Sequence, residues 1–251
     1  MTNFDSVNEQ LPPVRTMFYF CGGTGFNIGS QWVNHLNRNE SVAYVDTVDV
    51  AFMDTSKANV HPNIPKNTSY FVEDADGAGS DRGYIYPIVR PHIKQFLDRH
   101  EPAQFNVVVF SGGGGSGSVI GPLVIAELLA AKIPTVAVMV GTGESLDKAN
   151  NVIDTMKSLD SISAKANVPI PLVYVENVQS VPYAAIDEQV IEALAQLAIL
   201  TNQKHERLDS KDVENFIHYH KKSGQIPELC RLNIETTRQA ASLVQEPIAI
   251  A

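Results

Sequence analysis

The stretch that decides the fold is FNVVVFSGGGGSG, residues 105–117, in which a short apolar run leads directly into four consecutive glycines. Valine and phenylalanine are typical of a buried strand, and the apolar residues 119–129 that follow are typical of a helix. Glycines adopt positive φ angles and carry no Cβ, so their backbone N–H groups can converge on phosphate oxygens beside a helix N-terminus. The pattern predicts a phosphate-binding turn between a strand and a helix; the alternative is a mobile Gly/Ser linker.

A second stretch of the same kind lies near the start of the sequence. Residues 17–20 are apolar and predict a strand, and the glycine-rich loop CGGTGFNIG, residues 21–29, follows. Ile28, Trp32 and Leu36 have the spacing of one helix face, so residues 30–36 predict a helix after this loop. The sequence therefore offers two loops that can hold one polyphosphate.

The composition narrows the class of protein. The chain has 251 residues, of which 44% are hydrophobic, so it can bury one full core and is unlike a disordered chain. Its net charge of −9 argues against direct binding of nucleic acid or of an anionic membrane. The two cysteines form no CxxC pair and the N-terminus has no apolar targeting segment, so we expect a cytoplasmic protein.

Apolar runs typical of strands alternate with longer stretches of helical composition. This alternation predicts an α/β fold, with a doubly wound, mainly parallel sheet and helices on both faces. The predicted strands are residues 17–20, 42–45, 69–72, 106–110, 135–140 and 172–175. The predicted helices are residues 84–99, 119–131, 145–166 and 186–202.

A doubly wound sheet binds its ligand at the carboxyl ends of its strands. We therefore expect the site to comprise the loops that follow these strands, each of which carries a glycine or a carboxylate. The loops are residues 21–29, 46–49, 76–83, 111–117, 141–144 and 176–180.

Two familiar phosphate-binding motifs do not match. Walker A fails because no lysine follows either glycine cluster, and the Rossmann motif GxGxxG fails because Ile28 stands where the third glycine belongs. Asp46 follows the second predicted strand, where a dinucleotide binder places its ribose-binding acid, so a Rossmann-type enzyme stays open as an alternative. That alternative leaves the second glycine loop unexplained.

The glycine-rich loops resemble those of the tubulin and FtsZ family of GTPases. The family motif (S/A/G)GGTG(S/A)G is similar to SGGGGSG, residues 111–117, except that Gly114 replaces the threonine. The resemblance continues through residues 119–140 and includes the glycines of residues 21–29. A third family loop, which attends the terminal phosphate, is similar to residues 77–83 only in its opening Gly-Ala-Gly. The resemblance implies a tubulin/FtsZ-type nucleotide-binding domain.

The chemistry of guanine indicates which residues would bind the base. Guanine presents two adjacent donors that one carboxylate accepts, whereas adenine presents an acceptor. Tyr183 and Asp187 are four residues apart at the start of a predicted helix, so they lie on one face. The pair resembles FtsZ, where an aromatic residue and an Asp at this spacing bind guanine. The alternative is a packed ring with an acid that stabilises the helix N-terminus. The predicted nucleotide-binding residues are Gly22, Gly23, Thr24, Gly25, Asn27, Asp46, Gly77, Ala78, Gly79, Gly112, Gly113, Gly114, Gly115, Ser116, Gly117, Gly141, Glu144, Asn177, Tyr183 and Asp187.

Two candidate catalytic residues follow the long predicted helix. HERLDSKDV, residues 205–213, is similar to the family's catalytic loop NxDxxD, with Arg207 in place of the asparagine. The resemblance implies that Asp209 and Asp212 position the attacking water in the GTP site of a neighbouring subunit, with Mg²⁺ as the cation. In the alternative interpretation, Asp209 caps a helix and Asp212 is an acid of its first turn.

The expected organisation is an N-terminal extension (residues 1–16), a GTP-binding domain (17–202) and a catalytic-loop helix with a short tail (203–251). Family members continue with a second α/β domain, and we expect no full second domain here. The compact size and divergent loops resemble phage and plasmid tubulin relatives, which implies the cytoplasm of a bacterial host. The implied partner is a second copy of the chain, head to tail, with an adaptor protein left open. The alternative is a GTP-binding regulator or scaffold that neither hydrolyses GTP nor forms filaments.

Overall fold

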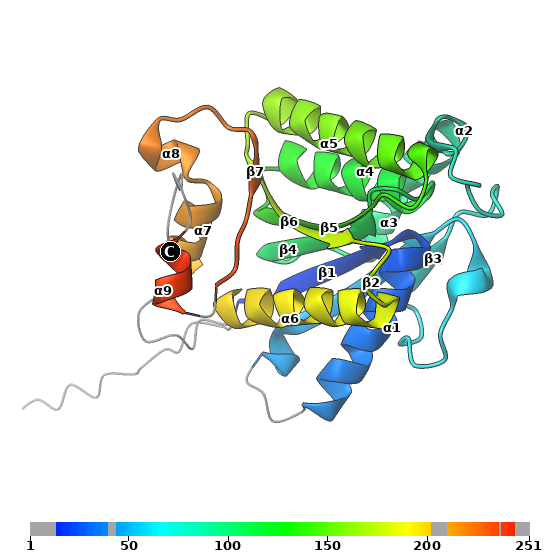
Figure 1. Cartoon of the computed structure of the whole chain (residues 1–251), viewed down its shortest axis with the longest axis horizontal. Coiled ribbons are helices and arrows are strands. Elements are labelled where there is room, and N and C mark those ends of the chain that lie inside the picture. Colours follow the sequence, from blue (N-terminus) through cyan, green and yellow to red (C-terminus); the bar gives the residue numbers. More distant parts are fainter. Residues whose placement is uncertain (1–13, 40–43, 202–209, 236, 244–251) are drawn as a thin grey trace, which may run out of the picture.

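The computed structural model describes residues 14–39, 44–201, 210–235 and 237–243. Within these residues, seven strands form one parallel sheet in the order β3-β2-β1-β4-β5-β6-β7, so the predicted α/β fold is confirmed (Figure 1). The strands are β1 (Thr16–Cys21), β2 (Val48–Asp54), β3 (Ser69–Phe71), β4 (Phe105–Ser111), β5 (Thr135–Thr142), β6 (Ile170–Asn177) and β7 (Leu229–Arg231). The helices are α1 (Gly22–Arg38), α2 (Arg82–Val89), α3 (Ile93–Arg99), α4 (Gly117–Ala130), α5 (Leu146–Ala166), α6 (Tyr183–Thr201), α7 (Ser210–Ile217), α8 (His220–Ser223) and α9 (Arg238–Ala241).

Helices cover both faces of the sheet, which is why its central strands are continuous apolar runs. Val107, Val108, Val109 and Phe110 of β4 are all fully buried, two on each face. Helices α2, α3, α4 and α5 pack on one face, and α1 and α6 pack on the other (Figure 1). The loops at the carboxyl ends of the strands, here called the carboxyl edge, therefore meet on one side of the molecule, opposite the amino edge.

The second strand differs from the prediction. The strand predicted at residues 42–45 is wrong at Tyr44 and Val45, because β2 is Val48–Asp54 and a 3-10 turn at Val45–Thr47 precedes it; residues 42 and 43 lie outside the described residues. Two similar apolar runs lie close together in this part of the sequence. Only the second places Phe52 in the core on one face and Met53 in the core on the other, so pairing with β1 selects it.

Two further elements differ from their predictions. The helix predicted at residues 84–99 is interrupted by a 3-10 turn at Arg90–His92, because Pro91 lacks the N–H that continues a helix. The sequence analysis does not predict β7, whose three residues are too few for a periodic signal, yet it pairs parallel with β6. The chain after α6 thus returns to the same sheet. The predicted boundary between the GTP-binding domain and the segment that begins at residue 203 stays a prediction. Among the described helices, none combines the length and the apolar character that crossing a bilayer requires.

Candidate functional site

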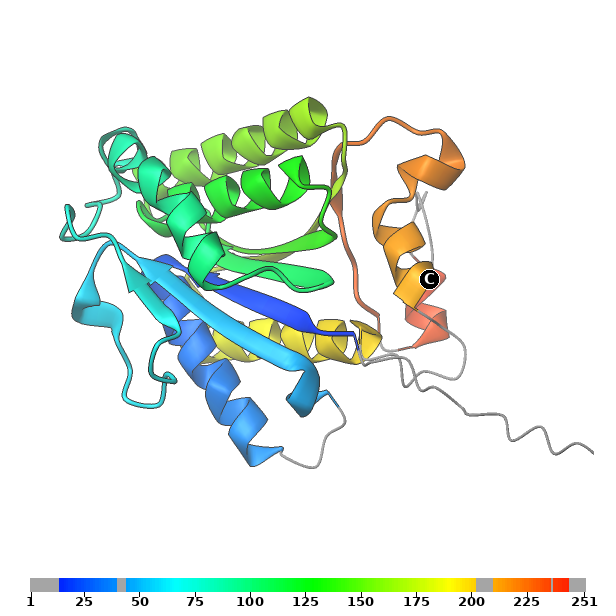
Figure 2. The same cartoon turned by 180° about the vertical axis from the view of Figure 1, so that it is seen from behind.

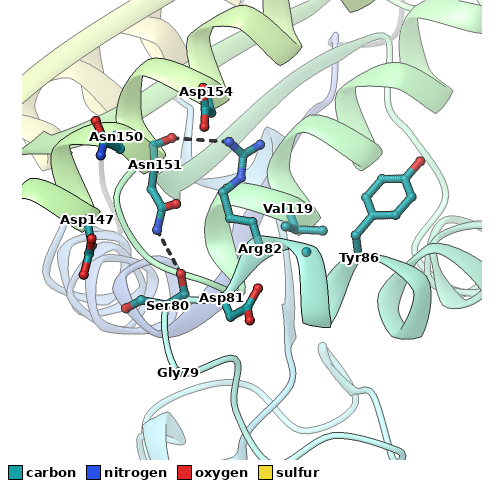
Figure 3. Close-up of a pocket in the computed structure, with 11 residues that line it drawn as sticks. Gly79, Ser80, Asp81, Arg82, Tyr86, Val119, Asp147, Asn150, Asn151 and Asp154 are labelled. Carbon is teal, nitrogen blue, oxygen red and sulfur yellow. Dashed lines mark hydrogen bonds between the residues drawn. The ribbon is translucent and has the colours of Figure 1, made fainter.

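The loops of the carboxyl edge enclose a cavity of about 340 Å³, and nine of the predicted nucleotide-binding residues line it. A larger cavity of about 690 Å³ lies between residues 79–83 and α5, but only Gly79 among the predicted residues lines it (Figure 3). The smaller cavity is therefore the candidate site. Its lining is Gly23, Thr24, Asn27, Ser111, Gly114, Val140, Gly141, Thr142, Glu144, Lys148, Asn177, Tyr183, Ile186 and Asp187.

The N-termini of α1 and α4 lie side by side at one end of this cavity. A Cβ on Gly22 would lie 2.5 Å from the backbone nitrogen of Gly117, so no side chain fits between them. Residues 22–29, which we predicted as a loop, are instead the first turns of α1, because Gly22 at φ +73° turns the chain directly from β1 into the helix. Two helix N-termini that point to one place form a strong anion site.

The glycine loop between β4 and α4 is held by hydroxyl groups at both ends. Ser111 Oγ accepts a hydrogen bond from the N–H of Gly113 at 3.3 Å. Ser118 Oγ donates to the carbonyls of Gly114 and Gly115. A Cβ on Gly114 would lie 3.9 Å from its nearest neighbour, so the threonine of the family motif would fit without a change in the loop.

The loop that carries Gly77, Ala78 and Gly79 lies against the glycine loop. A Cβ on Gly115 would lie 2.4 Å from the Cβ of Ala78, which shows how closely the two loops approach. Gly77 and Gly79 adopt positive φ angles of +85° and +54°, and nothing lies within 4 Å of a Cβ built on either. This third loop therefore borders the glycine loop with its own backbone open to the solvent.

The neighbouring hydroxyls of Thr55 and Ser116 lie beside these loops, 2.6 Å apart. Ser116 is a predicted site residue, whereas Thr55 follows the true end of β2, a strand that was predicted at other residues.

Two other predicted glycines lie where helices and strands pack closely. Gly25 allows α1 to pack on β1. Gly112 faces Met139 of β5.

The opposite end of the cavity holds Asp187, which is only 9% exposed. Asn27 Nδ2 and Gln31 Nε2 of α1 donate to its Oδ2 at 2.8 Å and 2.6 Å. Burial raises the pKa of Asp187, while the hydrogen bonds from Gln31 and Asn27 lower it. The sequence analysis missed Gln31, although its position four residues after Asn27 places both amides on the same face of α1.

Glu144 lies between the two ends of the cavity and gathers three donors. Lys148 Nζ reaches it at 2.5 Å and Asn177 Nδ2 at 3.2 Å, and Tyr183 Oη also donates to it. The hydrogen bond from Lys148, followed by that from Tyr183, lowers the pKa of Glu144. The ring of Tyr183 is 64% exposed, with its face available for stacking.

Asp46 does not belong to this site. It lies in the 3-10 turn Val45–Thr47, at the amino edge, because β2 begins after it, at Val48. The acid at the carboxyl end of β2 is Asp54, which is 2% exposed and accepts hydrogen bonds from Thr55 N–H at 2.7 Å and Asn59 Nδ2 at 3.0 Å. Burial raises the pKa of Asp54. The basis for a Rossmann-type enzyme is therefore lost.

Asp212 lies in the first turn of α7, at the amino edge. The other candidate catalytic residue, Asp209, lies outside the described residues. Helix α6 has 19 residues and is about 28 Å long, and it separates α7 from the nucleotide-binding loops (Figure 2). A cavity of about 210 Å³ marks where α7 meets the amino ends of β4 and β5, lined by Val14, Gln104, Phe105, Pro134, Thr201, Lys211, Val213 and Glu214.

Comparisons with known proteins agree with this geometry. The sequence model of the phage tubulin-like protein C-terminal domain matches residues 208–251. A phage tubulin-like protein of Pseudomonas phage PhiPA3 is 41% identical over 242 residues, which is 96% of this chain and 73% of that protein.

Solved structures show the same likeness. A protofilament of TubZ from Bacteriophage PhiKZ has a TM-score of 0.85 at 31% identity, over 93% of this chain and 72% of that one. The phage tubulin PhuZ with GDP also has a TM-score of 0.85, at 37% identity over 93% of this chain and 71% of that one. The predicted tubulin-type fold is confirmed, and this chain belongs to the family of phage tubulin-like proteins.

Proposed function

We propose that this chain binds GTP in the carboxyl-edge cavity, assembles head to tail with further copies of itself, and hydrolyses GTP to GDP where two copies meet. Two of its relatives support the proposal, since one is described as a protofilament and another as a GDP complex. As in a phage-encoded protein, we expect this to take place in the cytoplasm of a bacterial host.

The chemistry of Asp187 supports guanine as the base. Both amide donors reach its Oδ2, so the lone pairs of Oδ1 are left to accept from the N1–H and the amino group of guanine. The ring of Tyr183 would stack on the base, and Glu144 and Asn177, which lie between Asp187 and the glycine loop, would meet the ribose hydroxyls.

The phosphates would lie on the N–H groups of the glycine loop and of the two helix N-termini. Among the described residues, no group of three or more His, Cys, Asp or Glu side chains can hold a metal by itself. Mg²⁺ usually binds to phosphates and keeps several waters, so it would arrive with the nucleotide. The paired hydroxyls of Thr55 and Ser116 are oxygen ligands that fit it, and the ion would spread the charge that develops on the phosphates.

One observation supports catalysis between subunits: Asp212 lies at the amino edge, and the glycine loops lie at the carboxyl edge of the same chain. The two sets of residues cannot meet within one molecule. Head-to-tail stacking brings the amino edge of one copy against the carboxyl edge of the next, so that Asp209 and Asp212 would position the attacking water there.

A mixing experiment tests this arrangement. We expect Asp212→Ala to bind GTP with unchanged affinity and to lose turnover by about 100-fold or more, because a water-positioning group is removed. We expect Asp187→Ala to bind GTP poorly while its α7 stays intact. A mixture of the two variants should regain turnover, since the second variant supplies Asp212 to the first. The matched control is Asn215→Ala, one turn further along α7.

The outcomes separate the candidate functions. Unchanged turnover in Asp212→Ala would contradict the catalytic role, and no recovery in the mixture would contradict catalysis between subunits. GTP binding by the unaltered chain without turnover at any protein concentration would favour the regulator or scaffold.

A further inference from the structure

Asn151, on the second turn of α5, lies between two of the loops at the carboxyl edge (Figure 3). Its Nδ2 donates to the carbonyl of Ser80 at 3.0 Å and to the carbonyl of Gly113 at 3.3 Å. Both partners are acceptors, so only the amino group of the carboxamide, with its two donors, satisfies them. One side chain thus ties the loop of residues 77–83 to the glycine loop.

The same face of α5 holds the glycine loop a second time. Thr155, one turn after Asn151 and fully buried, has its Oγ1 3.0 Å from the carbonyl of Gly112 and 2.6 Å from that of Asn151, so its single proton is shared between the two. The carbonyls of Gly112 and Gly113 therefore point at α5, while the N–H of Gly113 donates to Ser111 Oγ, so the N–H groups that the loop offers to a ligand begin at Gly114. Helix α5 fixes the orientation of the glycine loop.

Arg82 holds the loop of residues 77–83, the other loop that Asn151 contacts. The half-buried guanidinium donates to the carbonyls of Asn151 and Ser118 at 3.4 Å each, and to Ser158 Oγ at 3.2 Å. Arg82 begins α2, directly after the loop of residues 77–83, so these contacts join α2 to α4 and α5. The loop is fixed at both of its points of attachment to α5, at Ser80 and at Arg82.

The order of the strands shows which part of a nucleotide this loop faces. Asp187 follows β6 and Glu144 follows β5, whereas the glycine loop follows β4, α1 follows β1 and the loop of residues 77–83 follows β3. A nucleotide with its base on Asp187 extends across the edge in this order. Ala78 and Ser80, which border Gly115, lie toward the far end of this order, so each added phosphate extends the ligand in their direction.

We propose that Asn151 is a positioning residue that lets the site distinguish a nucleoside triphosphate from a diphosphate, an inference that rests on the proposed function. By holding Ser80 against Gly113, it keeps the backbone N–H groups of residues 78–80 within reach of the terminal phosphate. Elsewhere in the loop, the Gly77 N–H donates to the carbonyl of Thr55 at 3.1 Å and Ala78 packs against Gly115, so what Asn151 adds is the side-chain hydrogen bond that holds Ser80. A diphosphate ends at the glycine loop and gains nothing from this contact.

The test compares two affinities in three variants. GDP and a non-hydrolysable GTP analogue are titrated, with Mg²⁺, into the unaltered chain, Asn151→Ala and Asn150→Ala. Loss of the two hydrogen bonds should weaken binding of the triphosphate analogue by about three- to tenfold and that of GDP by less than about twofold. Asn151→Asp should discriminate no better than Asn151→Ala, since a carboxylate would face two carbonyl oxygens. Asn150 is the matched control: it is exposed on the neighbouring position of α5, and its side chain makes no hydrogen bond within the described part of the chain.

A merely structural role would give a different result. If Asn151→Ala weakens both ligands equally, or neither, the inference is wrong. Asn151→Ser, whose hydroxyl can donate to only one carbonyl, replaces Asn151→Ala if thermal unfolding shows that the alanine variant does not fold, and the same affinity ratio decides. If the unaltered chain binds neither GDP nor the analogue, the proposed function itself fails, and the inference with it.

Discussion

The two edges of the sheet have opposite characters. At the carboxyl edge, backbone turns after several strands converge with the carboxylates of Glu144 and Asp187 on one cavity, and Gly23 and Gly141 of its lining leave no room for a side chain. At the amino edge, the strands end in contacts that close the core, such as the hydrogen bond of 2.6 Å between the hydroxyls of Thr16 and Thr201. Under the proposed function, binding and chemistry are therefore built at separate ends of one chain, and a second copy would unite them.

The largest expected effect comes from breaking the geometry of the carboxyl edge. Gly22→Ala places a Cβ 2.5 Å from Gly117 at a positive φ angle, so we expect a loss of about 2–4 kcal/mol in the free energy of unfolding and loss of GTP binding. Chemical denaturation and nucleotide titration measure both quantities.

Gly143→Ala is the control for that substitution. Nothing lies within 4 Å of a Cβ on Gly143, which is also at the carboxyl edge, so its unfolding should change by less than about 0.5 kcal/mol. Equal effects of the two substitutions would show that the close approach of the two helix N-termini does not matter.

A smaller effect, limited to the ligand, is expected from Asp187→Asn. The amide presents one acceptor and one pair of donors to the two donors of guanine, so the affinity for GTP should fall by about 30- to 100-fold. Discrimination against ATP should fall with it. Isothermal titration with both nucleotides measures these changes, and Glu188→Gln, on the next and exposed position of α6, serves as control. Retained preference for GTP in Asp187→Asn would exclude the carboxylate as the guanine-binding group.

The smallest effect concerns the amino edge and depends on pH. His218, directly after α7, is 2% exposed, and burial lowers its pKa to about 4. The charges of Lys221, His220 and Lys211 lower this pKa further, whereas the carboxylate of Glu214 raises it. The unfolded chain takes up this proton near pH 6.5 and the folded chain only near pH 4, so protons stabilise the unfolded state between these values. Stability is fully present above pH 6.5 and is lost as the pH falls.

We expect a loss of about 1 kcal/mol from this group between pH 7.5 and pH 5.5, visible in denaturation midpoints. His218→Gln should remove that part of the pH dependence, whereas His61→Gln, in the half-exposed loop after β2, should retain it. The same pH slope in both variants would rule out His218 as its source.

The sequence predicted most of the fold because parallel strands buried on both faces are uninterrupted apolar runs, and β4 with its glycines is the strongest example. It predicted Asp187 and Tyr183 because helical spacing fixes which side chains share a face. The prediction of the fold failed where two neighbouring segments both fit the pattern of a strand. The runs on either side of Asp46 are equally apolar, and only pairing with β1 decides between them, so Asp54 was missed. Gln31 and Asn151 were missed because an amide has no distinctive spacing, and its partners come from distant loops.

The sheet ends on both sides in a strand of only three residues, β3 on one and β7 on the other. Short outer strands are a common protection against edge-to-edge pairing, which drives irreversible aggregation. A chain that is meant to associate with copies of itself faces this danger at high local concentration more than most. With little strand to extend, its sheet offers no template for continuous β-structure. In the proposed head-to-tail assembly, growth would instead use the loops and helix ends of the two edges.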